Sequence, residues 1–424
     1  MMLVRADVGG DGWWREVERQ GAPWVEAGPS GQCAVTFLWR DPQGNERASP
    51  IRRVWINISG VTDHHSDTGP QSLERIAGTD VWFWHTSLGE RWRGSYCFIP
   101  CRDDGDVGRL SAAAPGDRAG LRAAWRGVFP AAVADRLNPL RAWTNGRGHA
   151  VSALHMPLAP AQAAWRELDA LGPVAGRTVP PLPAPAALAR HRWRSERLGN
   201  SRDIWIFTTG RQHESGRPLA LLLDGQFWAR QMPVWSPLLH MTAAGALPEA
   251  VYVLIDAVDS RRRGDELTCN PQFWRAVREE LLPRVAAWAP YRASPATTVV
   301  AGQSYGGLSA LYACLNWPRY FGCVLSQSGS FWWPDRDAAQ NGSGDACRLL
   351  GQIERGLGDG LALRAFIEAG DRERLIHRVN DRAVELLRGQ GHQVDYRVVD
   401  GGHDALCWRG GLLDGLAALW SPRG

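Results

Sequence analysis

Residues 297–316 of this 424-residue chain read TTVVAGQSYGGLSALYACLN, and this stretch decides the fold of the C-terminal half. An apolar run, Thr297–Ala301, leads through a Gly-x-Ser-x-Gly turn centred on Ser304 into the helix-compatible run Leu308–Asn316. This order of strand, sharp turn and helix is typical of a nucleophile elbow, in which the turn exposes the serine hydroxyl and small neighbours avoid clashes. We therefore expect Ser304 to be the nucleophile of a hydrolase.

A serine hydroxyl needs a base that accepts its proton, and after an elbow of this kind the chain order is serine, acid, histidine. Three histidines follow Ser304. His377 lies in a predicted helix, and His392 lies in a predicted turn. His403 directly follows the last predicted strand, at the carboxyl edge of the sheet where such a base is needed. We expect His403 to be the base.

The acid should lie on the loop after the preceding strand, which offers Glu368, Asp371 and Glu373. Glu368 is expected to lie still on the strand, which Gly370 would end. Glu373 is then best spaced to turn back toward His403 and fix its tautomer. The spacing therefore favours Glu373 as the acid and leaves Asp371 as the alternative.

The oxyanion of an acyl-transfer intermediate needs two backbone N–H donors. The residue after the nucleophile, Tyr305, is expected to supply one of them. The loop after the predicted strand Leu219–Leu223 is expected to supply the other through the amide of Gln226, with Gly225 as a neighbouring alternative.

The spacing of apolar runs changes along the chain and predicts two domains. In the first third, short runs separated by turns predict an all-β sandwich; they are Cys33–Trp39, Arg53–Ile58, Val81–His85 and Ser95–Ile99. A helical stretch is expected over Ala112–Val133. Five prolines between 173 and 185 predict a linker. We expect an N-terminal domain over 1–172, a linker over 173–189 and a catalytic domain over 190–424.

Beyond the linker, strands and helices alternate, which predicts an α/β hydrolase domain with a mostly parallel sheet flanked by helices. The predicted strands are Ile204–Thr208, Leu219–Leu223, Val251–Ile255, Thr297–Ala301, Cys323–Leu325, Ala365–Glu368 and Tyr396–Val399. The predicted helices are Pro271–Trp288, Leu308–Asn316, Leu375–Leu387 and Leu412–Trp420.

The composition favours an ordinary soluble protein of the cytoplasm. No apolar run approaches the roughly eighteen residues of a membrane helix, and residues 1–20 lack the apolar core of a secretory signal. Eight dispersed cysteines without metal-ligand spacing are typical of reduced core thiols. All 48 basic residues are arginine, yet no dense basic run interleaved with aromatics appears, so no nucleic-acid partner is expected.

The C-terminal half resembles the enterochelin esterase family, cytoplasmic hydrolases of ferric catecholate siderophores such as enterobactin. The resemblance is carried by Leu222–Gly225, Leu254–Ala257, Glu266–Leu267, Cys269–Asn270, Ala301–Tyr312, Phe321–Pro334 and Gly401–Leu412. It aligns Ser304, His403 and Glu373 with the family's nucleophile, base and acidic residue. The N-terminal third fits the family's sandwich domain more patchily, through Asp135 and Leu137–Pro139.

The resemblance implies hydrolysis of the trilactone of 2,3-dihydroxybenzoylserine, with iron entering only as part of the substrate and no metal or organic cofactor. The ferric substrate carries three negative charges, so Arg262 and Arg263, after the strand Val251–Ile255, are candidates for binding it, unless they form a solvated loop. Trp332 and Trp333 either stack on catechol rings or pack in the core.

Residues between Asp259 and Glu266 depart from the family, which leaves cyclic, linear and glucosylated siderophores, ferric or iron-free, open as substrates. A general carboxylesterase or acyltransferase of the same fold, and a siderophore-binding protein with little turnover, are the alternative functions. The oligomeric state and the part that the N-terminal domain plays in substrate binding are left open.

Overall fold

The computed structural model describes residues 2–66, 68–111, 117–170, 185–210, 216–342 and 347–421. The chain forms two compact units. Unit 1 comprises Met1–Pro180 together with Asp400–Cys407, and unit 2 comprises Pro181–Val399 together with Trp408–Gly424. Each unit contains one eight-stranded sheet. The chain therefore has an N-terminal domain built on an antiparallel sheet and a second, separate sheet domain.

The sheet of unit 1 has the strand order β1-β2-β5-β4-β3-β6-β8-β7, and each neighbouring pair is antiparallel. Its strands are β1 Trp24–Ala27, β2 Gln32–Arg40, β3 Arg53–Ile58, β4 Gln71–Arg75, β5 Val81–Gly89, β6 Arg93–Cys101, β7 Trp143–Thr144 and β8 Ala150–His155. The helices of this unit are α1 Asp11–Gln20, α2 Asp104–Ser111, α3 Arg118–Val128 and α4 Arg166–Asp169, with 3-10 turns at Met2–Val4, Phe129–Ala131 and Ala163–Trp165.

Strands β2 and β6 stand apart in this order, yet their side chains meet in one core. The rings of Phe37 on β2 and Tyr96 on β6 are 4.9 Å apart edge to face, and Val35, Val54 and Phe98 join the same buried cluster. The sheet therefore curls so that two of its parts face each other across a shared core. The predicted sandwich accounts for this packing, but its two layers belong to one continuous hydrogen-bonded strand order.

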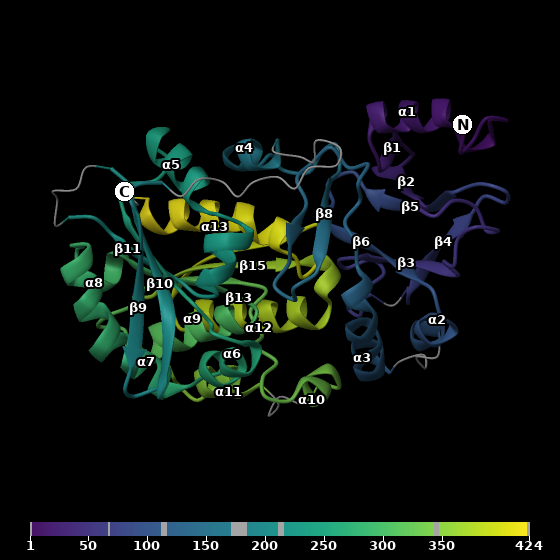
Figure 1. Ribbon diagram of the computed structural model, residues 1–424. Helices are drawn as coiled ribbons and strands as arrows, with labels where there is room; N and C mark the ends of the chain where they lie inside the picture. The colour runs from purple at the N-terminus through teal and green to yellow at the C-terminus, as the bar shows by residue number, and fades with distance from the viewer. Residues whose placement is uncertain are drawn as a thin grey trace. The chain divides into compact units, whose positions relative to one another are not determined.

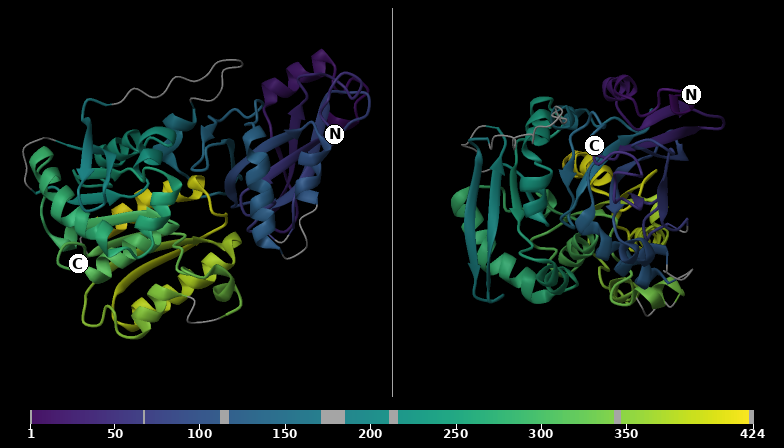
Figure 2. Two further views of the ribbon diagram at one scale, coloured as in Figure 1. Left: turned by 60° about the horizontal axis from the view of Figure 1, so that its bottom comes forward. Right: turned by 45° about the vertical axis from the view of Figure 1, so that its right-hand side comes forward.

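The sheet of unit 2 has the order β16-β15-β14-β13-β11-β12-β10-β9, in which β11 to β16 are parallel and β9 and β10 form an antiparallel edge. Its strands are β9 Leu188–Ser195, β10 Asn200–Thr208, β11 Leu219–Leu222, β12 Val251–Ile255, β13 Thr298–Gln303, β14 Cys323–Gln327, β15 Arg364–Gly370 and β16 Gln393–Val399. The long strands β9 and β10 stand out at one side of this sheet in the right-hand view of Figure 2.

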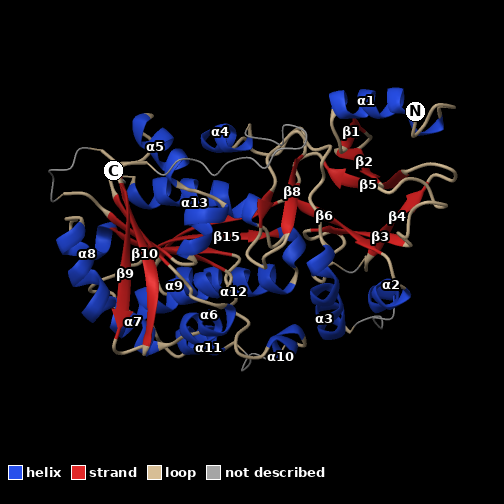
Figure 3. Cartoon of the chain, viewed as in Figure 1, coloured by secondary structure: helices blue, strands red, loops and turns tan. Residues whose placement is uncertain are grey.

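Helices cover both faces of this sheet (Figures 1 and 3). They are α5 Trp235–Ala243, α6 Ser260–Leu267, α7 Pro271–Ala276, α8 Leu282–Trp288, α9 Tyr305–Asn316, α10 Arg336–Gln340, α11 Arg348–Glu354, α12 Leu375–Gly389 and α13 Ala405–Trp420, with π turns at Phe227–Gln231 and Val277–Leu281 and 3-10 turns at Pro295–Thr297 and Asp371–Glu373. Figure 1 shows α13 on one face and α9 and α12 on the other. Alternate residues of β15 explain this, because Ala365 and Ile367 join the core with α9 and α12, whereas Phe366 approaches α13 at Gly415.

The described residues confirm the predicted strands within a few residues and also reveal several that the pattern did not indicate. Strands β1, β4, β7, β8 and β9 and helix α1 were not predicted. Of the helix expected over Ala112–Val133, α3 Arg118–Val128 is confirmed and ends in a 3-10 turn, and residues 112–116 lie outside the described residues. Most of the predicted linker, residues 173–184, lies outside the described residues, and positions 188 and 189 already belong to β9. Among the described residues, no helix combines the length and apolar character needed to cross a bilayer.

Candidate active site

Ser304 occupies the turn between β13 and α9 in a strained backbone conformation. Its φ is 59° and its ψ is −119°, a region that a residue with a Cβ adopts only where the surrounding structure imposes it. The Ser304 N–H donates to the carbonyl of Gln327 at 2.9 Å, and the Ser304 carbonyl accepts the N–H groups of Leu308 and Ser330. The turn is therefore fixed by both α9 and the loop after β14, as a nucleophile elbow requires.

The glycines around Ser304 serve different purposes. A Cβ on Gly302 would lie 2.4 Å from the backbone of Gly306, and a Cβ on Gly307 would lie 2.6 Å from Ser326 Oγ. A Cβ on Gly306 would meet nothing closer than 3.6 Å. The close approach of strand and helix thus requires Gly302 and Gly307, whereas the space at Gly306 admits a methyl group.

We expect Gly302→Ala to destabilise unit 2 by about 2 kcal/mol or more, because the added methyl group must push backbone against backbone. Gly306→Ala is the matched control and should change the free energy of unfolding by less than about 1 kcal/mol. Urea unfolding followed by circular dichroism measures both. Equal destabilisation by the two variants would contradict the tight turn described here.

Glu373 ends the short 3-10 turn that follows β15. Its side chain is buried, with 1% of the residue exposed. Carboxylate oxygen Oε2 accepts the hydroxyl of Ser328 at 2.6 Å and the N–H of Gly370 at 2.7 Å, and the Trp408 indole N–H donates to the same Ser328 hydroxyl. Two donors on one carboxylate oxygen fix the orientation of the group. Asp371, in contrast, is exposed.

Glu368 lies on β15, as predicted, and anchors a buried row of polar side chains across the sheet. Gln303 Nε2 donates to Gln327 Oε1 at 2.9 Å, and Gln327 Nε2 donates to Glu368 Oε1 at 2.7 Å. The guanidinium of Arg397 binds the second oxygen of Glu368. Burial raises the pKa of Glu368, and the charge and hydrogen bonds of Arg397 oppose that rise. Both oxygens of Glu368 therefore have partners within the sheet.

His403 lies on the loop that joins β16 to α13. The segment Asp400–Cys407, which comprises this loop and the first three residues of α13, belongs to unit 1, whereas Ser304 and Glu373 belong to unit 2. The predicted catalytic domain of 190–424 treats the loop as part of the second domain, so its membership of unit 1 was not foreseen. Within unit 1 the imidazole of His403 stacks on that of His65, with ring centroids 5.4 Å apart.

The two predicted oxyanion donors lie on fixed turns of unit 2. Tyr305 is the first residue of α9, so its N–H is one of those that the helix leaves without an intrahelical acceptor. Gln226 follows β11, and its side-chain oxygen accepts the N–H of Ala257 at 2.9 Å. At Gly225 a Cβ would lie 2.4 Å from the backbone of β12, so this turn also needs a glycine. Both amides are therefore held in place by neighbouring structure.

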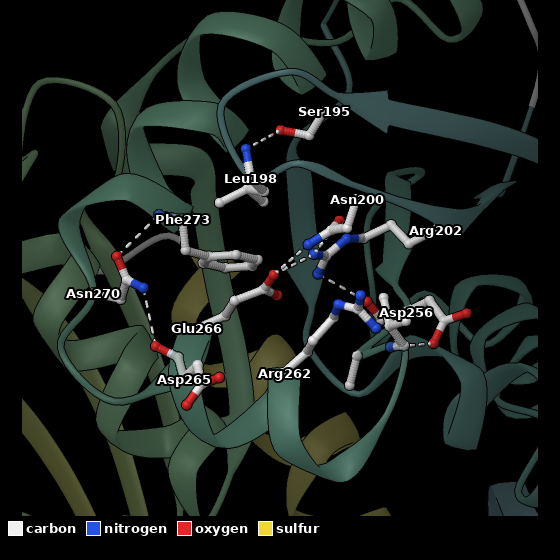
Figure 4. A network of polar contacts seen from close by, with 12 residues as sticks. Ser195, Leu198, Asn200, Arg202, Asp256, Arg262, Asp265, Glu266, Asn270 and Phe273 are labelled. Atoms are coloured by element: carbon white, nitrogen blue, oxygen red, sulfur yellow. Dashed lines mark hydrogen bonds and ion pairs between the residues drawn. The ribbon is translucent and has the colours of Figure 1, made fainter.

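The arginines after β12 lie in α6, so the alternative that they form a solvated loop does not hold. The carboxylate of Asp259 caps α6 by accepting the Arg262 N–H at 2.8 Å, and it also pairs with the Arg262 guanidinium at 2.7 Å. The Arg262 side chain is 46% exposed. Figure 4 shows the network behind α6, in which the buried Arg202 guanidinium binds Glu266 at 2.6 Å and fixes the helix to β10.

Arg263 points back toward the elbow. Its Nε and Nη2 bind the two carboxylate oxygens of Asp224 at 2.6 and 2.7 Å, and Nη2 also donates to the carbonyl of Gln303 at 3.2 Å. Burial works against the guanidinium charge, but the attraction and hydrogen bonds of Asp224 outweigh it and raise the pKa of Arg263. With 26% of its side chain exposed, Arg263 connects the β11 turn to the elbow, and its charge is already balanced.

The two predicted tryptophans differ in exposure. Trp332 is 9% exposed and packs in the main core, where its ring lies 5.8 Å from that of Tyr305 and beneath the Arg336 guanidinium. Trp333 is half-buried under Arg348. Core packing therefore accounts for Trp332, and Trp333 keeps more of its surface exposed.

The sequence analysis did not single out two serines beside the site. Ser330 Oγ lies 3.1 Å from Ser304 Oγ, and Ser328 Oγ donates to Glu373. Both follow β14 in the run Ser326-Gln-Ser-Gly-Ser. The sequence could have indicated these two serines, because a polar run directly after a buried parallel strand lies at the same sheet edge as the elbow.

Within the described ranges, one cluster of His, Cys, Asp or Glu side chains has donor atoms close enough to share a cation. It consists of Asp63, His64 and His65 in unit 1, with donor atoms within 4.8 Å of one another. Burial raises the pKa of Asp63, while the backbone N–H groups of Gly60 and His65 lower it. The cluster contains neither the nucleophile nor the candidate acids, which lie in unit 2.

Comparisons with known proteins identify relatives over the full chain. The family model described as "Enterochelin esterase, N-terminal" matches residues 34–165, and that described as "Putative esterase" matches residues 195–419. An iron(III) enterobactin esterase of Escherichia coli is 52% identical over 99% of this chain and 98% of its own.

Two solved structures agree with this result. A ferric enterobactin esterase from Salmonella typhimurium has a TM-score of 0.86 at 50% identity, covering 97% of this chain and 98% of its own. The enterobactin esterase from Shigella flexneri, solved in the presence of enterobactin, has a TM-score of 0.84 at the same identity and coverage. The chain therefore belongs to the enterochelin esterase family.

Proposed function

We propose that this chain is a serine esterase that opens the trilactone of ferric enterobactin or a close catecholate relative. The observation that carries the proposal is the full-length similarity to iron(III) enterobactin esterases, one of which is 52% identical in sequence. In this chain Ser304 also adopts the strained backbone conformation of a nucleophile elbow. The strand order and the elbow after β13 support an α/β hydrolase fold for unit 2. The curled sheet supports a family-type sandwich for unit 1.

In the proposed reaction, Ser304 Oγ attacks a lactone carbonyl while His403 accepts the hydroxyl proton. Glu373 fixes the tautomer of His403 and stabilises the imidazolium. The N–H groups of Tyr305 and Gln226 stabilise the oxyanion. Collapse of the intermediate breaks the lactone C–O bond, and His403 returns the proton to the leaving serine hydroxyl of the substrate. Water then cleaves the acyl-enzyme by the same steps and releases a carboxylic acid.

This chemistry needs no resident metal or organic cofactor, because a nucleophile, a base, an acid and two N–H donors suffice for ester hydrolysis. Iron enters as part of the substrate. Reaction at the Asp63, His64 and His65 cluster is not required for any step. The proposed compartment is the cytoplasm, which is supported by eight buried cysteines outside any disulfide.

Substrate recognition is proposed for Arg262, whose exposed guanidinium suits an anionic complex, and for Trp333, whose exposed surface suits a catechol ring. Arg263 and Trp332 are proposed to act indirectly. Arg263 links Asp224 to the carbonyl before Ser304, and Trp332 packs on Tyr305. Both would set the positions of the oxyanion donors.

The experiment compares ferric enterobactin, iron-free enterobactin, its linear trimer, a glucosylated form and nitrophenyl acetate as substrates, with products followed by mass spectrometry. We expect ferric enterobactin to gain water and yield linear trimer and shorter fragments, with kcat/KM well above that for nitrophenyl acetate. A general carboxylesterase would cleave the neutral ester equally well. Tight binding without products would make the chain a siderophore-binding protein.

A further inference from the structure

The loop that carries His403 is joined to the N-terminal sheet by backbone contacts. The N–H of Arg93, the first residue of β6, donates to the carbonyl of Asp400 at 3.1 Å. Arg93 and Gly401 form a parallel β-bridge, and the thiol of Cys407 lies 3.5 Å from the Arg93 carbonyl. The start of the loop and the first turn of α13 therefore both meet the start of β6.

Asp404, next to His403, adds a side-chain anchor. One of its carboxylate oxygens accepts both the backbone N–H of Ser95, at 3.0 Å, and the Ser95 hydroxyl. The other accepts the N–H of Leu406 at 2.7 Å. Asp404 is 3% exposed, so these hydrogen bonds are shielded from competing water. Asp404 thus ties the loop to β6 immediately beside the base.

The segment after β3 also contacts the His403 loop, through Gly60 and His65. A Cβ on Gly402 would lie 2.8 Å from the backbone nitrogen of Gly60, so the two backbones are in close contact. The ring of His65, which is itself buried, stacks on His403 at 5.4 Å with an interplanar angle of 28°. These contacts limit both the path of the loop and the plane of the imidazole.

We propose that the N-terminal sheet domain positions the catalytic base, with Ser95, Asp404 and His65 as its positioning residues. A base held to within a fraction of an ångström is worth a large factor in rate, since misplacement by about 1 Å can cost roughly a hundredfold. Unit 1 then contributes to the chemical step itself, in addition to any contact with the siderophore. The inference rests on the proposed role of His403.

The test measures how fast a fluorophosphonate labels Ser304, together with kcat and KM on nitrophenyl acetate, in the full-length protein. Neither readout involves siderophore recognition. We expect Ser95→Ala to slow labelling and lower kcat by roughly ten- to a hundredfold while KM stays unchanged. Asp404→Asn should act similarly, and the double variant should be little worse than either single one, because both remove the same anchor.

Ser152→Ala is the matched control. Ser152 is also buried in the sheet of unit 1, where it pairs with Tyr96, and its hydroxyl accepts the N–H of Asp135 at 2.9 Å, a hydrogen bond that does not involve the His403 loop. Ser152→Ala should lose about as much stability as Ser95→Ala, but its Ser304 should be labelled at the rate of the unmodified protein. Equal slowing by Ser95→Ala and Ser152→Ala would overturn the inference, because it would indicate a general loss of folding.

His403→Ala separates this inference from the proposed function. If His403→Ala hardly labels while Ser95→Ala labels at the normal rate, the positioning role is wrong and the proposed triad stands. If His403→Ala itself labels at the normal rate, the proposed base is wrong and the positioning role fails with it. Slow labelling in both variants, with an unaffected Ser152→Ala, supports both.

Discussion

Ser304→Ala is expected to lower kcat for ferric enterobactin by a factor on the order of 10⁵, because no acyl-enzyme can form without the hydroxyl. Folding should be preserved. The elbow at φ 59° imposes the same strain on alanine as on serine, and the backbone hydrogen bonds to Gln327 and Ser330 do not involve the side chain. Product formation by mass spectrometry measures the loss of turnover, and tryptophan fluorescence quenching measures retained binding.

Ser330→Ala provides the control for this result. Its hydroxyl lies 3.1 Å from that of Ser304, so its removal alters the surroundings of the nucleophile without removing the nucleophile. We expect a loss of no more than about tenfold, the effect of one neutral hydrogen bond. Turnover by Ser304→Ala above about a thousandth of the normal value would refute the assignment of the nucleophile.

The individual strands and the nucleophile elbow were predictable, because the sequence patterns that indicate them span only a few consecutive residues. Apolar runs of three to five residues predicted each parallel strand of unit 2, and the elbow was recognised from five residues and the segments on either side of them. The placement of Glu373 followed from the same logic, since a strand that ends at Gly370 leaves little choice for the next turn. Strands such as β1 and β7, four and two residues long, are too short to show a periodic pattern.

Long-range contacts were not predictable, because no local pattern records them. Ser95 and Asp404 are 309 positions apart, and only the folded chain brings their side chains together. The same holds for Arg263. Its charge and position after a strand indicated ligand binding, but its partner Asp224, 39 residues earlier, neutralises it within the protein. A sequence shows which residues are able to do chemistry, and the fold decides which of them are already paired.

Substitution of the proposed acid, Glu373, is also expected to have a large effect on kcat. Glu373→Gln should lower kcat by roughly 10³ to 10⁴, because an amide cannot stabilise the imidazolium and favours the wrong tautomer of His403. The change is nearly isosteric, so the donors Ser328 and Gly370 keep an acceptor on the amide oxygen. The fold should therefore survive, which a circular dichroism melt can verify.

Asp371→Asn is the comparison that decides between the two candidates, and it should change kcat by less than about threefold. Asp371 is exposed, and surface groups outside the reacting constellation seldom affect the chemical step. If Asp371→Asn lowered kcat more than Glu373→Gln did, the acid would be Asp371. That result would also mean that the buried carboxylate of Glu373 serves only to hold the turn after β15. Glu373 is held by two donors and is 1% exposed, and on this basis we expect Glu373→Gln to lower kcat more than Asp371→Asn does.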